Sequence, residues 1–406
     1  MNDWRETTLR DEIELAYGKS LPAHAREAGR FGVFGSNGLV GTHTESCVDG
    51  PGIVVGRKGS VGEVVYSTEA FWPIDTTYFV VNKGKHDWRF LYHLLRHSDL
   101  TGLNSHSAVP GLNREDAYSI AVKFPQHDEQ SNIASVLDCV ESSIRLETAA
   151  LENAQELKRA TMTRLFTRGL RGEAQKETGI GLVPESWEIE QLGDIAEIAY
   201  GAQAAVANST DPSIGTLILT NVNLDLDGHI NLEKRRYYKI PSAHKERLSL
   251  KKGDVLFNWR SGSADHVGKT VYFDLDGEFT YSSFILRFRP RKSVTSKFLF
   301  RWLTHLRVDG FFTSQRNVSS INSVYNASLS ATIPIWFPRQ EEQEAIVTIL
   351  DTLDRKIALH RQKRAVLEKL FKSLLHKLMT GEIRVNQLNL SALPDQASIE
   401  NLESAK

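Results

Sequence analysis

Residues 4–18 of this chain read WRETTLRDEIELAYG, and residues 187–201 read WEIEQLGDIAEIAYG, so that the same pattern recurs without a gap at an offset of 183. A second motif, FPQHDEQ at 124–130, returns as FPRQEEQ at 337–343, at an offset of 213. Each copy of the second motif leads into a long run with helical spacing. The chain is therefore predicted to contain a strand-rich unit and a long helix, followed by the same two elements again.

The segments between the two motifs support this interpretation. Residues 51–66 contain two apolar runs around a Gly/Ser loop, residues 79–82 form another strand candidate, and residues 88–95 have helical spacing. The second copy repeats this order with the segments 254–263, 267–272, 284–288 and 298–303. We therefore expect the two units to share their strand order and to differ in loop length and in the polar residues at the loop ends.

The two helical runs carry apolar residues that step by three and four, which is typical of a coiled-coil seam. The seam positions are Ile133, Leu137, Val140, Ile144 and Leu151 in the first run, and Ile346, Leu350, Leu353, Ile357 and Leu367 in the second. A helix of about 40 residues spans roughly 60 Å, which is more than one unit can cover. We therefore expect an intramolecular antiparallel pair, with polar interruptions at equivalent central places.

These patterns predict an α+β protein with a pseudo-two-fold internal repeat: two similar α/β units joined by two long antiparallel helices. The predicted boundaries are 1–125 and 187–338 for the units, 126–169 and 339–381 for the helices, 170–186 for a linker, and 382–406 for a polar, partly disordered C-terminal tail.

The composition excludes several classes of protein. The chain has 406 residues, 41% hydrophobic and 24% charged, and no apolar run long enough for a membrane span, so a cytoplasmic globular protein is expected. Cys47 and Cys139 lie in different segments without metal-ligand spacing, which argues against disulfides and zinc. The net charge is −1, so any affinity for nucleic acid must come from a few placed cations or from another subunit.

Motifs for catalysis are missing. There is no phosphate-binding loop, because the glycine-rich residues 56–60 have the wrong spacing and lie between two strand candidates. No Asn/Asp-Pro-Pro-aromatic motif for amino methylation occurs, no glycine-rich loop opens a helix for S-adenosylmethionine, and the histidines lack ligand spacing. The sequence therefore predicts no catalytic residue, no metal site and no cofactor bound by this chain.

The remaining candidates are polar residues on glycine-bounded loops in both units. Arg can pair bidentately with guanine and Asn with adenine, while Ser, Thr and Lys suit phosphate contacts. Taken singly, each loop is more typical of an ordinary solvated turn, but the pattern recurs in both units with different loop chemistry. The candidates for DNA contact are Ser36, Asn37, Arg57, Lys58, Ser60, Thr76, Thr77 and His106 in the first unit, and Asn221, Asn223, Asn258, Arg260, Ser261, Ser263, His266, Lys269, Ser282, Arg316 and Asn317 in the second.

With these motifs, nearly the whole chain resembles the specificity (S) subunit, HsdS, of type I restriction-modification systems. The resemblance is most specific at PESW (184–187) with the following LGDI (192–195), at both FP…EQ motifs with their helices, and at LMTGEIRV (378–385). The run GVFGSNGLVG (32–41) is similar to many recognition domains of that family.

The resemblance implies a non-catalytic subunit with two target-recognition domains, each binding one half of a bipartite double-stranded DNA site. The helices would set the spacer and dock two methyltransferase (M) subunits, which bind S-adenosylmethionine, while restriction (R) subunits use ATP and magnesium. From the residues alone, a coiled-coil scaffold that binds other proteins stays open, as does a self-contained endonuclease or methyltransferase. The specificity subunit of a related modification system that is not type I is a further alternative.

Overall fold

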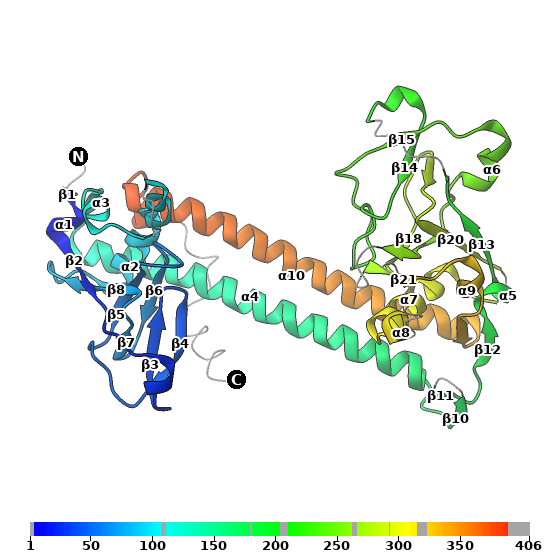
Figure 1. The fold of residues 1–406 in the computed structure, drawn as a ribbon, viewed down its shortest axis with the longest axis horizontal. Helices are drawn as coiled ribbons and strands as arrows, with labels where there is room; N and C mark the ends of the chain where they lie inside the picture. Colours follow the sequence, from blue (N-terminus) through cyan, green and yellow to red (C-terminus); the bar gives the residue numbers. More distant parts are fainter. Residues whose placement is uncertain are drawn as a thin grey trace. The chain divides into compact units, whose positions relative to one another are not determined.

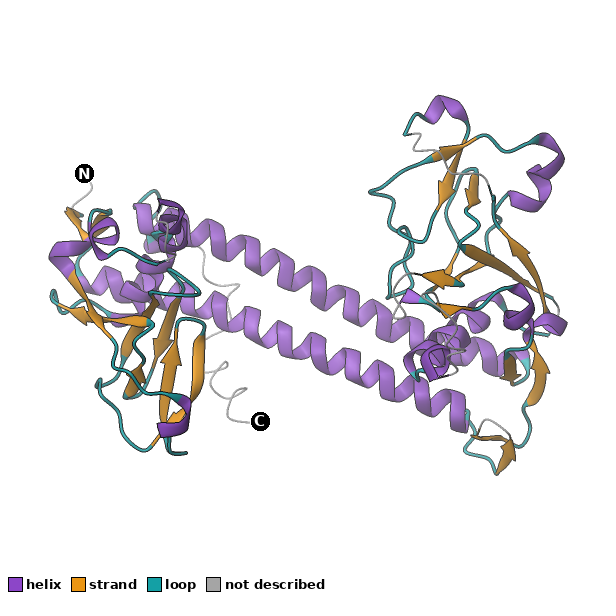
Figure 2. Ribbon diagram, viewed as in Figure 1, coloured by secondary structure: helices purple, strands orange, loops and turns teal. Residues whose placement is uncertain are grey.

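The protein is described by a computed structural model at residues 4–106, 111–178, 181–203, 210–261, 266–291, 293–314 and 323–388. It divides into two compact units, which we call unit 1 (Met1–Ala150 with His360–Lys406) and unit 2 (Leu151–Leu359). Each unit combines small β-sheets with short helices and with parts of both long helices (Figures 1 and 2). The predicted fold class, two similar α/β units with two long helices, is confirmed.

Unit 1 is built on a four-stranded antiparallel sheet with the order β2-β8-β5-β6. Its strands are β2 (Ile13–Tyr17), β8 (Thr77–Asn82), β5 (Gly52–Gly56) and β6 (Val64–Ser67). A three-stranded sheet has the order β4-β3-β7, in which β3 pairs antiparallel with β4 and parallel with β7. The strands of this sheet are β4 (Gly38–His43), β3 (Phe31–Gly35) and β7 (Phe71–Pro73). A further strand pair is formed by β1 (Arg5–Thr8) and β9 (Ala121–Phe124). The short helices are α1 (Leu9–Glu12), η1 (Ala23–Ala25), α2 (Trp88–His97), η2 (Leu100–His106) and α3 (Arg114–Tyr118).

Unit 2 repeats these sheets strand for strand. The four-stranded sheet has the order β13-β20-β16-β18, and the three-stranded sheet has the order β15-β14-β19 with the same antiparallel and parallel pairs. The strands are β12 (Glu188–Gln191), β13 (Ala196–Tyr200), β14 (Thr216–Leu219), β15 (Tyr237–Tyr238), β16 (Val255–Asn258), β17 (Arg260–Ser261), β18 (Thr270–Tyr272), β19 (Phe279–Tyr281), β20 (Ile285–Pro290), β21 (Ser323–Val324) and β22 (Pro334–Phe337). The helices are α5 (Leu192–Ile195), η3 (Pro212–Ile214), η4 (Ser242–His244), α6 (Lys245–Leu248), α7 (Ser296–Val308), α8 (Phe311–Ser314) and α9 (Ala327–Ala331). The duplication in sequence is therefore a duplication of topology.

The repeated Tyr-Gly pair has a steric explanation. Gly18 follows β2, and a Cβ atom there would lie 2.1 Å from the carbonyl oxygen of Ile74; at Gly201, which follows β13, it would lie 2.3 Å from the carbonyl oxygen of Ser282. Both distances are far below van der Waals contact, so only glycine lets the two chain segments approach at this point. The close approach brings the end of β2 or β13 against the loop that precedes the next strand of its sheet.

The long helices α4 (His127–Arg168) and α10 (Gln340–Thr380) run antiparallel within each unit. In unit 1, Ile133 and Val140 of α4 share the core with Phe371 and Leu378 of α10. In unit 2, Phe166, near the end of α4, shares the core with residues near the start of α10, including Ile346 and Leu350. The ends of both predicted seams thus pack into the cores of the units, and the expected antiparallel pair is confirmed.

The centre of the pair is a polar layer followed by a small apolar cluster. In unit 1, Glu147 Oε2 lies 2.7 Å from His360 Nδ1, and Lys363 also bonds to this carboxylate. Glu147 and His360 are separated by 213 positions, the repeat offset, so they occupy equivalent positions of the two long helices and bond to each other. In unit 2, Leu151, Ala154 and Ile357 form a buried cluster. The polar interruptions of the two seams therefore meet each other.

The FP…EQ motif connects each long helix to a short one. The buried side chain of Gln130 donates to the carbonyl of Pro125 (3.0 Å) and accepts from the amide of Asp87 (3.0 Å), the N-cap residue of α2. Gln343 makes the same bonds to Pro338 (2.9 Å) and to the amide of Thr295 (2.9 Å), the N-cap residue of α7. The repeated glutamine is thus a structural connection between the two helices of each unit.

Replacing the buried Gln343 with Ala is expected to lower the free energy of unfolding by about 1–3 kcal/mol, because the amide of Thr295 and the carbonyl of Pro338 lose their partner. Urea unfolding followed by circular dichroism measures this. Gln340→Ala is the matched control, since Gln340 is exposed on the same helix and bonds to the exposed Glu344. Equal losses for both variants would contradict the role assigned to Gln343.

Two segments of the predicted linker and tail contain regular structure. Within 170–186, β10 (Gln175–Thr178) and β11 (Gly181–Pro184) pair antiparallel, so that their backbone groups satisfy one another. Within 382–406, η6 (Val385–Gln387) is ordered, and Ile383, Val385 and Leu388 pack against the unit 1 core, because these apolar side chains would otherwise be exposed. Residues 389–406 lie outside the described part. Among the helices that the structure describes, none is both long enough and apolar enough to cross a membrane.

Candidate nucleic-acid interface

Three loops of unit 1 meet at one edge of its sheets, and we call this edge the unit 1 tip: the β3–β4 turn, the β5–β6 loop and the β7–β8 loop. The amides of Arg57 and Lys58 both donate to the carbonyl of Thr76 (3.0 Å each), and the Arg57 guanidinium donates to the carbonyl of Asp75 (2.8 Å). Gly59 has a φ of +79°, and a Cβ atom there would lie 3.2 Å from Ser36 Oγ. The sequence-predicted residues Ser36, Asn37, Arg57, Lys58, Ser60 and Thr76 are therefore brought together.

A tyrosine completes the unit 1 tip. The ring of Tyr17 is half exposed, with the guanidinium carbon of Arg57 at 5.1 Å and that of Arg114 at 4.6 Å from its centroid. Such cation–π contacts hold the guanidinium groups in place while leaving their edges available. Neither Tyr17 nor Arg114 was among the predicted residues, although the repeated Tyr-Gly pair marks Tyr17 in the sequence.

The corresponding edge of unit 2, which we call the unit 2 tip, consists of the β14–β15, β16–β18 and β19–β20 loops. The indole nitrogen of Trp259 donates to the carbonyl of Ser283 (2.7 Å), and the indole lies edge-on to Tyr200 at 5.5 Å. The guanidinium carbon of Arg260 lies 5.9 Å from the centroid of the Phe284 ring. Among the predicted residues, Asn221, Arg260 and His266 keep solvent exposure here.

Strand register makes the two tips equivalent residue by residue. Tyr17 pairs with Tyr78 and Gly56 with Thr77 in unit 1, while Tyr200 pairs with Leu286 and Asn258 with Ile285 in unit 2. It follows that Arg57 corresponds to Trp259, Asp75 to Ser283 and Thr76 to Phe284. In both units, a side-chain N–H of the residue after β5 or β16 donates to an equivalent carbonyl, that of Asp75 in unit 1 and that of Ser283 in unit 2. The scaffold of the tip is therefore conserved between the units, while its surface chemistry differs.

Several predicted residues are buried and support the loops instead of facing solvent. The Lys269 ammonium donates to the carbonyls of Asn221 (2.9 Å) and Leu224 (2.7 Å), and burial lowers its pKa below the usual value. Asn223 accepts from the amide of Thr220 (2.9 Å), and the Asn258 carboxamide donates to the carbonyl of His266 (2.8 Å). The buried group consists of Thr77, Asn223, Asn258, Ser261, Lys269 and Ser282.

For this buried group, the structure corrects the prediction of direct DNA contact, because side chains enclosed by the loops cannot reach a base edge. Ser263, Arg316 and Asn317 lie outside the described residues, and the side chain of His106, in η2, is likewise not described.

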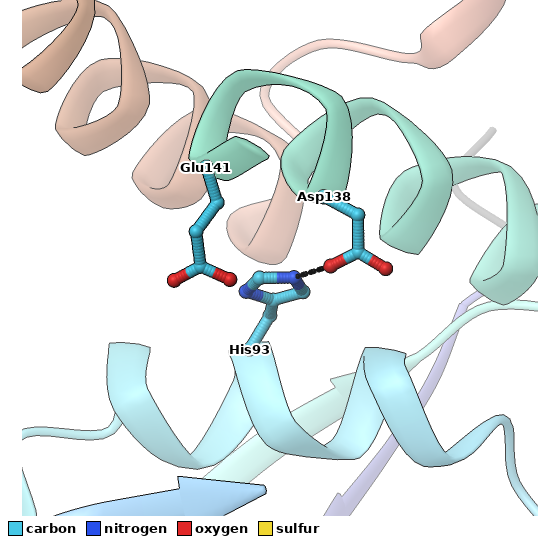
Figure 3. A group of neighbouring side chains, drawn as sticks. All are labelled: His93, Asp138 and Glu141. Carbon is cyan, nitrogen blue, oxygen red and sulfur yellow. Dashed lines mark hydrogen bonds and ion pairs between the residues drawn. The ribbon is translucent and has the colours of Figure 1, made fainter. Parts of the chain in front are cut away.

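One cluster in unit 1 resembles a metal site. His93 on α2 and Asp138 and Glu141 on α4 point toward one another (Figure 3), with His93 Nε2 2.7 Å from Asp138 Oδ1. Both carboxylates are already bonded by Arg89, and Glu141 also by Arg96. Burial raises the pKa of Asp138, but the hydrogen bonds from His93 and Arg89 outweigh it and hold that pKa below its usual value.

Unit 2 contains the same arrangement at the repeat offset. Asp351 and Asp354 on α10 correspond to Asp138 and Glu141, and Arg301 on α7 bonds to both of them at 2.6 Å. Since ion pairs between the short and the long helix recur in both units with different basic residues, we interpret the cluster in Figure 3 as a helix–helix ion-pair network. Its carboxylates satisfy arginine and are not arranged as free ligands.

The side chains of the two tips suit binding of a ligand. Cations, hydroxyls, carboxamides and aromatic rings are presented on loops held by backbone hydrogen bonds, which suits phosphate and base-edge contacts. Within the described residues of the tips, we find no nucleophile hydrogen-bonded to a general base. The tips are therefore candidates for sequence-specific recognition of a nucleic acid.

Comparison with known proteins agrees with this interpretation. A family model described as the type I restriction modification DNA specificity domain matches residues 1–156 and 184–369. The MjaVIII type I restriction enzyme specificity subunit of Methanocaldococcus jannaschii is 24% identical over 346 residues, which are 83% of this chain and 77% of the relative. The EcoDI specificity subunit of Escherichia coli is 21% identical over 99% of this chain and 93% of its own. The S subunit structure from M. genitalium superposes with a TM-score of 0.63 at 15% identity, covering 93% of this chain and 97% of that one.

Proposed function

Because the chain belongs to the type I restriction-modification DNA specificity family, we propose that it is the non-catalytic, sequence-reading subunit of such a complex and works in the cytoplasm. Unit 1 and unit 2 each read one half of a bipartite double-stranded DNA site. The observation that carries this proposal is the pair of tips, in which one strand topology and one backbone scaffold present different side chains. Two copies of a scaffold with different surfaces suit two different half-sites.

The long helices have two further roles in the proposal. Since α4 and α10 each run through both units, they can hold the two tips at a set separation and so define the length of the unread DNA spacer. They also carry exposed apolar side chains, such as Val366 (58% exposed) and Leu370 (38%) of α10, which suit a protein partner. We assign this surface to the modification subunits, two per chain because the units are duplicated.

In this proposal, the chemistry belongs to the partners. S-adenosylmethionine binds to the modification subunits, ATP and magnesium are used with the restriction subunits, and this chain holds no cofactor. The near-neutral net charge of the chain is compatible with tight DNA binding. Once one unit is bound, the second unit meets the same DNA molecule at a high effective concentration, so two weak contacts give a strong one.

The test uses the full chain purified with its modification subunits. Methylated adenines are mapped in the genome of the source cell, and a duplex with the mapped site is then footprinted beside a scrambled duplex. We expect protection of two separated segments only on the mapped site. Equal protection of both duplexes, or none, would favour a protein-binding scaffold instead.

Lys58→Ala in the same complex is expected to weaken binding and to reduce the slope of log affinity against log salt by about one, since one cation is lost from the phosphate contacts. Fluorescence anisotropy at several salt concentrations measures this. Lys123→Ala is the control, because Lys123 lies on β9, outside the tip loops, and pairs with Glu6. An unchanged slope for Lys58→Ala would remove this residue from the interface.

A further inference from the structure

Phe284 is an exposed aromatic residue on a rigid loop. It is 45% exposed, whereas the flanking Ser282 and Ile285 are buried at 2% and 0%. The loop is held by amide bonds from Ser282 to the carbonyl of Leu219 (2.9 Å) and from Ser283 to the carbonyl of Ala202 (2.9 Å). The ring is therefore presented in a set position, and its exposure is not a consequence of loose packing.

A cation accompanies the ring. The exposed Arg260 places its guanidinium carbon 5.9 Å from the centroid of the Phe284 ring, and the neighbouring Trp259 ties the same loop to the carbonyl of Ser283 (2.7 Å). An apolar ring beside an exposed positive charge suits a ligand that offers an apolar group next to an anion. Double-stranded DNA offers this combination, with phosphates along the backbone and one apolar group at the base edges, the C5-methyl of thymine.

The equivalent position in unit 1 has no aromatic ring. Thr76 occupies the place of Phe284, and its carbonyl accepts the amides of Arg57 and Lys58, so the scaffold forms without an aromatic ring. The two units therefore present different side chains at this position.

We propose that Phe284 packs on the C5-methyl group of a thymine in the half-site read by unit 2, while Arg260 contacts an adjacent phosphate. This inference rests on the proposed DNA-reading function and adds the chemical basis of one base choice. Unit 1 has Thr76 at this position and makes no equivalent contact there. Phe284 thereby becomes a specificity-determining residue.

The test removes the methyl group from the DNA and the ring from the protein independently. Duplexes with the mapped site carry deoxyuridine in place of each thymine in turn, and binding to the complete complex is measured for the unchanged chain, for Phe284→Ala and for Thr76→Ala. We expect one position in one half-site where removing the methyl group weakens binding of the unchanged chain about fourfold, the worth of one buried methyl. With Phe284→Ala this ratio should fall to about one, and with Thr76→Ala it should stay near four.

The outcomes are distinguishable. If the unchanged chain binds the mapped and scrambled duplexes equally, the proposed function itself fails. If it binds the mapped site specifically, but no deoxyuridine position couples to Phe284, the thymine contact is wrong and the function stands. A uniform loss of affinity for Phe284→Ala, with every methyl effect unchanged, would indicate insertion between base pairs and would also overturn the thymine contact. Circular dichroism of Phe284→Ala shows whether the variant is folded.

Discussion

Exchanging residues 5–124 for the corresponding segment of another specificity subunit is expected to change one half of the methylated DNA site and to leave the other half and the spacer unchanged. The two ends of the segment lie side by side, because β1 and β9 pair with Arg5 opposite Phe124. The exchange removes the whole unit 1 tip but keeps α4 and α10. Adenine methylation mapped across a genome measures both halves at once.

The design has an internal control. In unit 2, Glu188 of β12 lies opposite Phe337 of β22, so residues 188–337 can be exchanged with equivalent ends. This second exchange should change the other half-site only. The donor segment must keep a backbone amide for the side chain of Gln130 or Gln343, because those bonds join the exchanged part to the long helices. A change in both halves, or in neither, after a single exchange would refute the modular function.

Inserting one heptad into both long helices is expected to lengthen the unread spacer by about three base pairs. Seven residues add roughly 10.5 Å of helix and preserve the seam, and one base pair of DNA occupies about 3.4 Å. Suitable places are after Glu152 in α4 and after Ala358 in α10, where Leu151, Ala154 and Ile357 pack together. Mapping of methylated sites should then show the original half-sites at a greater separation.

An insertion into α4 alone is the matched control. It displaces one helix against the other and separates polar partners such as Lys158 and Asp354, so we expect loss of thermal stability and of methylation. If the double insertion is folded and active with an unchanged spacer, the helices do not set the separation of the half-sites.

The fold class was predictable because repetition is visible in linear sequence. The offsets of 183 and 213 identify the two units and the helices, and apolar spacing identifies the seam. The same patterns mark Gly18 and Gly201, although only the structure shows that neighbouring carbonyls leave no space for a side chain there. Likewise, Gln130 and Gln343 stand out in the sequence, and their role became clear from their bonds to α2 and α7.

The candidate site was predictable only in part. A loop rich in Asn, Lys, Ser and Thr looks the same in the sequence whether these side chains stabilise the loop or face a ligand. Lys269, for example, has the chemistry of a phosphate contact, but the fold encloses it between two carbonyls. Conversely, the side chain of Phe284 has no hydrogen-bonding group, so a prediction based on polar residues does not include it. Burial depends on packing between segments distant in sequence, and composition does not contain that information.

Local and repeated features of this protein follow from its residues: the duplication, the helices, the strand order and the few charges available for binding. They depend on spacing along the chain, which is a one-dimensional property. The correspondence of Arg57 with Trp259 and of Thr76 with Phe284 came from strand register, since the two residue types differ and the β5–β6 and β16–β18 loops have different lengths. The hydrogen bonds between strands set that register in three dimensions, and with it the side chains that each tip presents.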